Sequence, residues 1–401
     1  MSALMLMCLP PAVESGGNDQ SGVSSQAPTA FVTAAINEWC ILALRSVEMA
    51  PEIPTIMLAW RKHKGNVKPV WEEVPVPKPS ETQILVKLLA SGVCRSDISL
   101  LRYDTQPSWF QDRYILGHEG CGRIVQFGAS VGETALRIGD IVALHAVPGC
   151  RNETCTECDR DLSQICERGH HSGIGQDGFY APYATIDIRG AVPVPPGVLP
   201  AQAAVATDAV ATAYHAIFRR GEIKKHETVF LFGLGGLGMN ALQLLLYIGA
   251  EIVVSDTKQA CLDRALSLGV PSSHIVPLGT APQEFVLDNF KDIKIDVVLD
   301  FVGKHQTFQD AQNIVRRGGR LLCIGSLDNQ NMIEMKLATR KRLSFIFSYG
   351  SQAQDLPNVL ELIATKKVEP RVQSRPLKDL QAVLAELETG EVEARVVLTH
   401  S

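Results

Sequence analysis

Residues 229–256 carry the most restrictive pattern in the chain: an apolar run, a group of glycines, a second apolar run and an acidic residue. The run from Val229 to Phe232 is continuous and apolar, as expected for a parallel strand covered on both faces. A helix is predicted from Leu237 to Ile248, and a second strand from Ile252 to Val254 ends at Asp256. The order of strand, turn, helix and strand is that of a parallel α/β unit.

The glycines of the turn have the spacing G-x-G-G-x-G, at Gly233, Gly235, Gly236 and Gly238. In such a turn the first glycine permits the sharp bend, the second lets the backbone approach a pyrophosphate, and the last lets the helix pack closely on the strand. The helix N-terminus at Leu237 offers unpaired N–H groups and a partial positive charge to phosphates. We therefore predict a dinucleotide site, rather than an ordinary strand-to-helix turn.

Asp256 indicates which dinucleotide is bound. It lies about twenty residues beyond the glycines, where a carboxylate can accept hydrogen bonds from an adenosine ribose. A carboxylate there would also repel a 2′-phosphate, so we predict NAD(H) rather than NADP(H), although Lys258 follows two residues later.

The alternation of strands and helices continues after Asp256. Helices are predicted over residues 260–268 and 307–317, and strands over residues 296–301 and 320–324. Repeated units of this kind predict a doubly wound parallel sheet.

Composition excludes several classes of function. The chain has 401 residues, of which 46% are hydrophobic, enough for one large or two medium domains with full cores. The net charge is −5 and there is no long basic run, so nucleic acid is not an expected partner. The chain has ten cysteines and no convincing secretion signal. We therefore expect a reducing, cytoplasmic location in which the thiols bind metal.

Residues 1–54 are predicted to be a disordered extension. Residues 11–28 are rich in Ser, Gly, Gln and Pro. The apolar stretch 31–50 contains Glu38, Arg45 and Glu48, so no membrane span is predicted. Regular globular patterning begins near Thr55.

Two groups of residues have the donor chemistry that zinc prefers. The first contains Cys94 and Asp97 in SGVCRSDIS and His118 and Glu119 in LGHEGCG. Taken singly, Cys94 is also consistent with a small buried residue and His118 with a core or surface side chain.

The second group is four closely spaced cysteines, which predict a closed tetrahedral zinc site that stabilises a loop. Disulfides are the alternative, and the reducing compartment disfavours them. The residues are Cys150, Cys155, Cys158 and Cys166.

From Thr55 to Ser401 the chain resembles the zinc-dependent medium-chain alcohol dehydrogenases. The motif G-V-C-x-S-D followed by G-H-E-G carries the resemblance, together with the glycine turn and a cysteine lobe over residues 150–166. The resemblance implies a β-rich, partly barrel-like (GroES-like) catalytic domain over residues 55–208, a Rossmann domain over 209–343, and a C-terminal return over 344–401 that completes the first domain. The usual lobe spacing is C-x2-C-x2-C-x7-C; the last three cysteines match it, whereas the first gap, after Cys150, is x4.

The resemblance also implies roles for the first group of donors. Cys94 and His118 match the ligands of a catalytic zinc, Asp97 matches an acid that orients the histidine, and Glu119 matches a glutamate close behind the metal. Many relatives have a cysteine as third ligand where this chain has Asp208. An aspartate oxygen is a legitimate zinc donor, and the alternative is that Asp208 caps the following helix.

Four further positions match functional residues of the family. Ser96 matches the first hydroxyl of a proton relay, Arg95 a pyrophosphate contact and Thr212 a residue beside the nicotinamide. Arg395 matches an arginine that reaches the cofactor phosphates, with a charged residue at a strand edge as the alternative. Three histidines, His145, His170 and His171, are candidates for the wall of the substrate cleft.

The function that follows is reversible oxidation of an alcohol to an aldehyde or ketone with NAD⁺ and zinc, two ions per chain. A polyol dehydrogenase or an NADH-dependent carbonyl reductase is the alternative within the family, and a non-catalytic dinucleotide-binding protein is the alternative outside it. The expected partners are a small-molecule substrate and, by resemblance, further copies of the chain in a dimer or tetramer, without nucleic acid or membrane.

Overall fold

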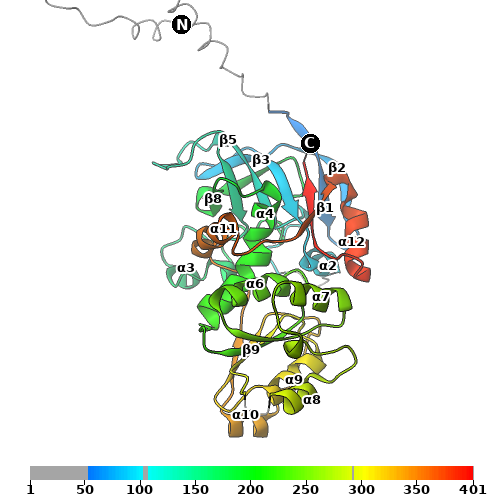
Figure 1. Cartoon of the computed structure of the whole chain (residues 1–401). Coiled ribbons are helices and arrows are strands. Elements are labelled where there is room, and N and C mark those ends of the chain that lie inside the picture. The colour runs from blue at the N-terminus through cyan, green and yellow to red at the C-terminus, as the bar shows by residue number, and fades with distance from the viewer. Residues whose placement is uncertain (1–52, 103–106, 291–292, 401) are drawn as a thin grey trace, which may run out of the picture. The chain divides into compact units, whose positions relative to one another are not determined.

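The computed structural model describes residues 53–102, 107–290 and 293–400. The predicted N-terminal extension lies outside the described residues, apart from positions 53 and 54. Among the described residues, no helix combines the length and apolar character that a membrane crossing needs. Residues 54–401 form one compact unit (Figure 1).

A five-stranded parallel sheet forms around β9, the strand that precedes the glycine turn. Its order is β10-β9-β11-β12-β13, which confirms the predicted doubly wound sheet. The predicted Rossmann range ended at residue 343, but the next four residues pair with β12, so this sheet extends past that border. The strands are β9 (Thr228–Phe232), β10 (Glu251–Ser255), β11 (Val297–Asp300), β12 (Arg320–Cys323) and β13 (Ser344–Phe347).

Alternate residues of β9 enter two different cores. Val229 and Leu231 pack with the apolar face of α6, whereas Phe230 and Phe232 pack with Phe308 and other side chains of the opposite layer. Both faces of the strand are therefore covered, which explains its continuous apolar run. The helices of this region are α6 (Gly238–Ile248), α7 (Gln259–Ser267), η5 (Ser272–His274), α8 (Pro282–Asn289), α9 (His305–Ile314) and α10 (Met335–Lys341).

Helix α9 ends earlier than predicted. The sequence pattern extends it to Arg317, but Val315 is extended and fully buried in the core, and Arg316 donates a hydrogen bond to Asp296 at 2.5 Å. Burying Val315 and pairing Arg316 with Asp296 stabilise the extended backbone more than one further helical turn would.

The second region is a mostly antiparallel sheet of the order β14-β15-β3-β5-β6-β8, with β7 paired to β3. The C-terminal strand β15, red in Figure 1, pairs with β3 from the beginning of the described chain. A smaller sheet of order β2-β1-β4 lies in the same region. The strands are β1 (Ile56–His63), β2 (Val70–Pro75), β3 (Gln83–Gly92), β4 (Arg113–Ile115), β5 (Glu119–Phe127), β6 (Ile141–His145), β7 (Tyr183–Asp187), β8 (Ala191–Pro193), β14 (Val372–Pro376) and β15 (Arg395–Thr399).

A helical connector joins the two sheets. It runs through α4 (Pro200–Val205), η3 (Ala206–Val210), α5 (Ala211–Tyr214) and η4 (His215–Arg220), and η3 and η4 are π-helical. Its buried residues are mainly alanines, which let α4 pack on β3 and β5 while α5 packs on α6. The remaining helices are α2 (Arg95–Arg102), α3 (Thr156–Asp159), η1 (Ser163–Ile165), η2 (Ile188–Gly190), η6 (Ala353–Asp355), α11 (Leu356–Ala364), η7 (Leu377–Asp379) and α12 (Leu380–Thr389).

Candidate functional site

A cleft of about 930 Å³ extends from the glycine turn to the first group of metal donors. Its size is within the range of small-molecule sites in proteins. The lining includes all the residues predicted for the cofactor, namely Arg95, Thr212, Gly233, Gly235, Gly236, Leu237, Gly238, Asp256 and Arg395.

The glycines of the turn are required by their surroundings. Gly233 has φ +85°, and a Cβ on Gly238 would lie 1.8 Å from the carbonyl oxygen of Gly233, so the last glycine permits the helix to follow the strand closely. A Cβ on Gly236 would lie 2.5 Å from Cδ of Arg395, whereas Gly235 has open space around it. The open side of the turn faces the cleft.

Asp256 holds the turn against the end of β10. Its carboxylate accepts hydrogen bonds from the backbone N–H of Leu234 at 2.6 Å and of Lys258 at 2.8 Å. Both bonds come from the backbone, so the carboxylate keeps acceptor capacity toward the cleft.

Four donor side chains converge at the other end of the cleft. The ligand atoms of Cys94, His118, Glu119 and Asp208 all lie within 4.8 Å of one another. Cys94 Sγ is 3.6 Å from Asp208 Oδ2, and His118 Nε2 is 3.8 Å from the same oxygen. Cys94 follows β3, His118 precedes β5, Glu119 begins β5 and Asp208 comes from the connector, so three separate segments build the cluster.

The π-helical segment η3 sets the position of Asp208. A π-helical turn inserts one residue into a helix and is frequent at functional sites. Asp208 reaches the cleft although its four neighbours in η3 are buried. It accepts a hydrogen bond from the Thr212 hydroxyl at 2.9 Å and no backbone capping bond, since it lies inside a continuous helical segment. The arrangement therefore differs from the helix cap considered as the alternative.

Asp97 supports two of the donors from a fully buried position. Its Oδ2 accepts hydrogen bonds from the backbone N–H of Cys94 at 2.9 Å and from the Tyr180 hydroxyl at 2.6 Å, and its Oδ1 lies 3.4 Å from His118 Nδ1. Tyr180 escaped the sequence analysis, because nothing in its own segment signals a contact with a residue 83 positions away. Gly117 is required beside it, since a Cβ there would lie 2.4 Å from the Tyr180 ring.

Glu119 and Arg395 form a buried ion pair next to the donors. Oε1 of Glu119 accepts from the guanidinium, while its buried Oε2 has no hydrogen-bond partner among the described residues. A Cβ on Gly92 would lie 1.9 Å from this Oε2, so a larger residue there would displace the Glu119 carboxylate. Arg395 is buried, unlike the strand-edge residue considered as its alternative, and it lies between the glycine turn and the donors.

The donors perturb one another's ionisation. Burial raises the pKa of the Cys94 thiol, but the Arg395 guanidinium opposes this and the net shift is downward. Burial also opposes ionisation of Asp208, but His118 and Arg395 lower its pKa. Burial opposes a charge on His118 as well, but Asp97 and Cys94 raise its pKa well above the usual value. A thiol, a carboxylate and an imidazole form a donor set that suits Zn²⁺, and a bound cation would displace the protons that they share.

Ser96 and Arg95 lie at the start of α2, on the wall of the cleft. Ser96 Oγ is 3.5 Å from Cys94 Sγ. Arg95 donates to the carbonyl oxygens of Leu387 and Glu388, near the end of α12, at 3.3 and 3.5 Å.

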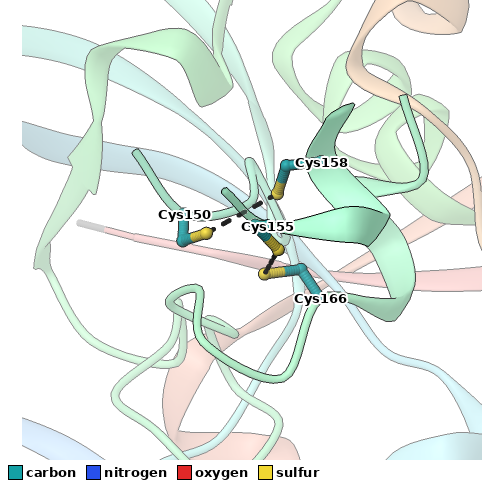
Figure 2. Close-up of side chains that lie close together, drawn as sticks. All are labelled: Cys150, Cys155, Cys158 and Cys166. Atoms are coloured by element: carbon teal, nitrogen blue, oxygen red, sulfur yellow. Dashed lines mark hydrogen bonds between the residues drawn. The ribbon is translucent and has the colours of Figure 1, made fainter. Parts of the chain in front are cut away.

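The four-cysteine lobe forms a second cluster, shown in Figure 2. Sγ of Cys150 lies 3.8 Å from Sγ of Cys158, and Sγ of Cys155 lies 3.7 Å from Sγ of Cys166. A disulfide requires about 2.05 Å. A tetrahedron with zinc–sulfur bonds of about 2.3 Å has edges of about 3.8 Å. The spacing therefore fits a tetrahedral metal site and not a disulfide, and it includes Cys150 despite the longer first gap.

The thiols of this lobe titrate over a wide range. Slight burial raises the pKa of Cys150, but the backbone of Asn152 and the neighbouring thiols lower it to about 7. Burial and the neighbouring thiols raise the pKa of Cys158 to about 12. Thiolates this close repel one another, and a bound divalent cation removes that repulsion.

Only one of the three histidines considered for the cleft lines it. His145 does so, whereas His170 and His171 do not belong to the cleft lining. His171 lies against Trp109, with ring centroids 4.4 Å apart, and bonds to the carbonyl oxygen of Cys166 at 2.5 Å. Its role is to pack the cysteine lobe.

Comparisons with known proteins agree with this geometry. Two family models match, the alcohol dehydrogenase GroES-like domain over residues 80–196 and the zinc-binding dehydrogenase domain over residues 236–365. An alcohol dehydrogenase of Geobacillus stearothermophilus is 30% identical over 330 residues, covering 82% of this chain and 95% of the relative. One from Rhizobium meliloti is 29% identical over 337 residues, covering 82% and 94%.

Among solved structures, the acetophenone reductase of Geotrichum candidum in complex with NAD is 29% identical, with a TM-score of 0.77. The match covers 87% of this chain and 98% of that protein. The chain therefore belongs to the zinc-containing alcohol dehydrogenases of the medium-chain dehydrogenase/reductase family.

Proposed function

We propose that this protein is an NAD(H)-dependent zinc alcohol dehydrogenase, which converts a primary or secondary alcohol to an aldehyde or ketone and also catalyses the reverse reaction. One observation supports this most: four zinc-type donors converge at one end of a cleft whose other end is the glycine turn. A non-catalytic dinucleotide-binding protein would have no use for the donors Cys94, His118 and Asp208 in that place.

Cys94, His118 and Asp208 would hold the catalytic zinc, and Glu119 lies close enough to donate as well. When bound, zinc lowers the pKa of an alcohol hydroxyl and NAD⁺ accepts a hydride. The Cys94 thiolate and Asp208 carboxylate balance the charge of the cation, while Asp97 orients the imidazole of His118.

The other residues position the reactants and the proton. Thr212 fixes Asp208 through its hydroxyl, and Ser96, beside Cys94 on the cleft wall, is the first hydroxyl available to take the substrate proton. Arg395 compensates the charge of Glu119 behind the donors, and Arg95 is a candidate for the pyrophosphate once it leaves the end of α12. Asp256 selects the ribose of NAD(H).

The experiment that tests the proposal combines metal analysis with kinetics on the purified full-length protein. Two clusters predict about two equivalents of zinc per chain by elemental analysis. Oxidation of secondary alcohols should proceed with NAD⁺, and kcat/KM with NADP⁺ should be lower by at least about tenfold, because Asp256 repels the 2′-phosphate. One equivalent of zinc together with no turnover would refute the proposal.

We propose further that the protein is a cytoplasmic homo-oligomer, a dimer or tetramer. All the cysteines in the described part of the chain are free, as expected in a reducing compartment. β13 lies at the edge of the parallel sheet, and the side chain of Phe347 at its end is mostly exposed. A sheet edge with an exposed aromatic side chain suits pairing with a second copy. Sedimentation equilibrium should show an oligomer that Phe347→Lys shifts toward the monomer, and a monomeric parent protein would contradict this.

A further inference from the structure

Apart from His118 of the donor cluster and Arg395 of the ion pair, three residues of the cleft lining have a buried polar atom without a hydrogen-bond partner among the described residues: His145 at Nε2, Gln164 at Oε1 and Ser348 at Oγ. The three side chains belong to residues that are only 4%, 6% and 8% exposed. Buried polar atoms in proteins are almost always hydrogen-bonded, and an exception needs an explanation. Three exceptions in the lining of one cleft point to a ligand that supplies the partners.

His145 lies beside the metal donors. It ends β6 and stands directly opposite Glu119 in the antiparallel pair of β5 and β6. Residues directly opposite each other in such a pair project to the same face of the sheet, so His145 projects to the side of Glu119. Its electrostatic interaction with Asp208 agrees with this position.

Ser348 and Gln164 belong to the same part of the cleft. Ser348 follows β13 and precedes Tyr349, whose pKa responds to the charges of His118, Asp208 and Cys94. Gln164 comes from the cysteine lobe, and its side chain lies 3.4 Å from the position of a Cβ on Gly350. The loop 348–350 therefore lies between the metal donors and the cysteine lobe.

The chemistry of the three atoms selects neutral hydroxyl groups. His145 is buried, and among the described residues its Nε2 has no hydrogen-bonded carboxylate that would favour the charged imidazolium. A neutral imidazole nitrogen and a serine hydroxyl can each serve as donor or acceptor according to tautomer or rotamer, and an amide oxygen accepts. None of the three carries the positive charge that a carboxylate or phosphate substituent would require.

We infer that the substrate is a neutral alcohol with further hydroxyl groups, a polyol or its hydroxyketone, and that His145, Gln164 and Ser348 bind those hydroxyls. This rests on the proposed function and narrows its substrate class. A plain alkyl alcohol would bury the three polar atoms without giving them hydrogen-bond partners. A site built to bind a substrate hydroxyl therefore discriminates strongly against an alcohol that lacks this hydroxyl.

The test compares butane-2,3-diol with butan-2-ol, two substrates that differ by one hydroxyl, in the zinc-loaded protein with NAD⁺. We expect kcat/KM for the diol to exceed that for butan-2-ol by at least about tenfold. Ser348→Ala should lower this ratio by about three- to tenfold, and His145→Phe by about tenfold, since each removes one partner of the added hydroxyl.

Ser172→Ala is the matched control. Ser172 is also buried with an unpartnered hydroxyl, but it does not belong to the cleft lining, so the ratio should stay unchanged. The inference is overturned if the wild-type ratio is one or lower, or if Ser348→Ala and His145→Phe change it no more than the control does.

If the protein oxidises neither alcohol, the proposed function fails, and binding decides the inference separately. In the presence of NADH, a rise in melting temperature with the diol but not with butan-2-ol supports the three-residue hydroxyl site. Equal shifts, or no shift with either compound, overturn it.

Discussion

Asp208→Asn is expected to lower kcat/KM for alcohol oxidation by at least about 100-fold and to reduce bound zinc from about two equivalents to about one. Replacing a residue that only hydrogen-bonds to a metal ligand already lowers metal affinity or activity by about 10- to 100-fold. Replacing a ligand itself should lower them by at least as much. Asparagine has the same shape and its Oδ1 can still accept the Thr212 hydroxyl, so the change removes the anionic charge while the local hydrogen bond remains.

Asp310→Asn is the matched control for this substitution. Asp310 is a buried carboxylate that, like Asp208, accepts a hydrogen bond from a side chain four residues away, that of Gln306 at 2.9 Å, but it lies in α9 outside the cleft lining. Its zinc content and kcat/KM should equal those of the parent protein. If Asp208→Asn also kept two equivalents of zinc and full activity, Asp208 would be a structural residue of the connector and not a ligand.

The cofactor region was predictable because its signals are local. The glycine turn, its flanking strand and the first helix occur within residues 229–248, and Gly233 and Gly238 reflect backbone requirements that other residues do not meet. Cys94 and His118 were recognisable from motifs of a few residues. The structure brings them together with Asp208 at one end of the cleft.

The features that escaped the sequence analysis depend on distant contacts. Tyr180 meets Asp97 through packing of segments far apart in the chain, and Gly92 is needed only because Glu119 approaches it from another strand. The cleft lining joins His145, which the sequence analysis had named, to Gln164 of the cysteine lobe and Ser348 of the loop after β13, which it had not. No local period or propensity encodes such a juxtaposition.

Two features of the structure cannot be read from the local sequence pattern. The π-helical turn around Asp208 has the same alanine-rich composition as the α-helices on either side, so a helical pattern cannot distinguish them. The segment SFIF of β13 is a short apolar run that could form a strand in either sheet. Only its pairing with β12 shows that it belongs to the parallel sheet.

Cys150→Ser is expected to remove the zinc of the cysteine lobe, and with it at least about 2 kcal/mol of unfolding free energy. The sulfur of Cys150 lies 3.8 Å from that of Cys158, and a serine hydroxyl is a poor replacement for a thiolate on zinc. Bound zinc should fall to about one equivalent per chain, and the segment 150–166 should become the first site of cleavage in limited proteolysis.

Cys323→Ser controls for the loss of a thiol as such. Burial raises the pKa of Cys323 to about 12, so it is a neutral thiol in β12, away from both donor clusters. Its zinc content should stay at about two equivalents. The lobe also carries Gln164 of the three-residue hydroxyl site, so Cys150→Ser should lower the preference for butane-2,3-diol over butan-2-ol as well. Unchanged zinc in Cys150→Ser would mean that three cysteines suffice and that the long first gap excludes Cys150 from the metal.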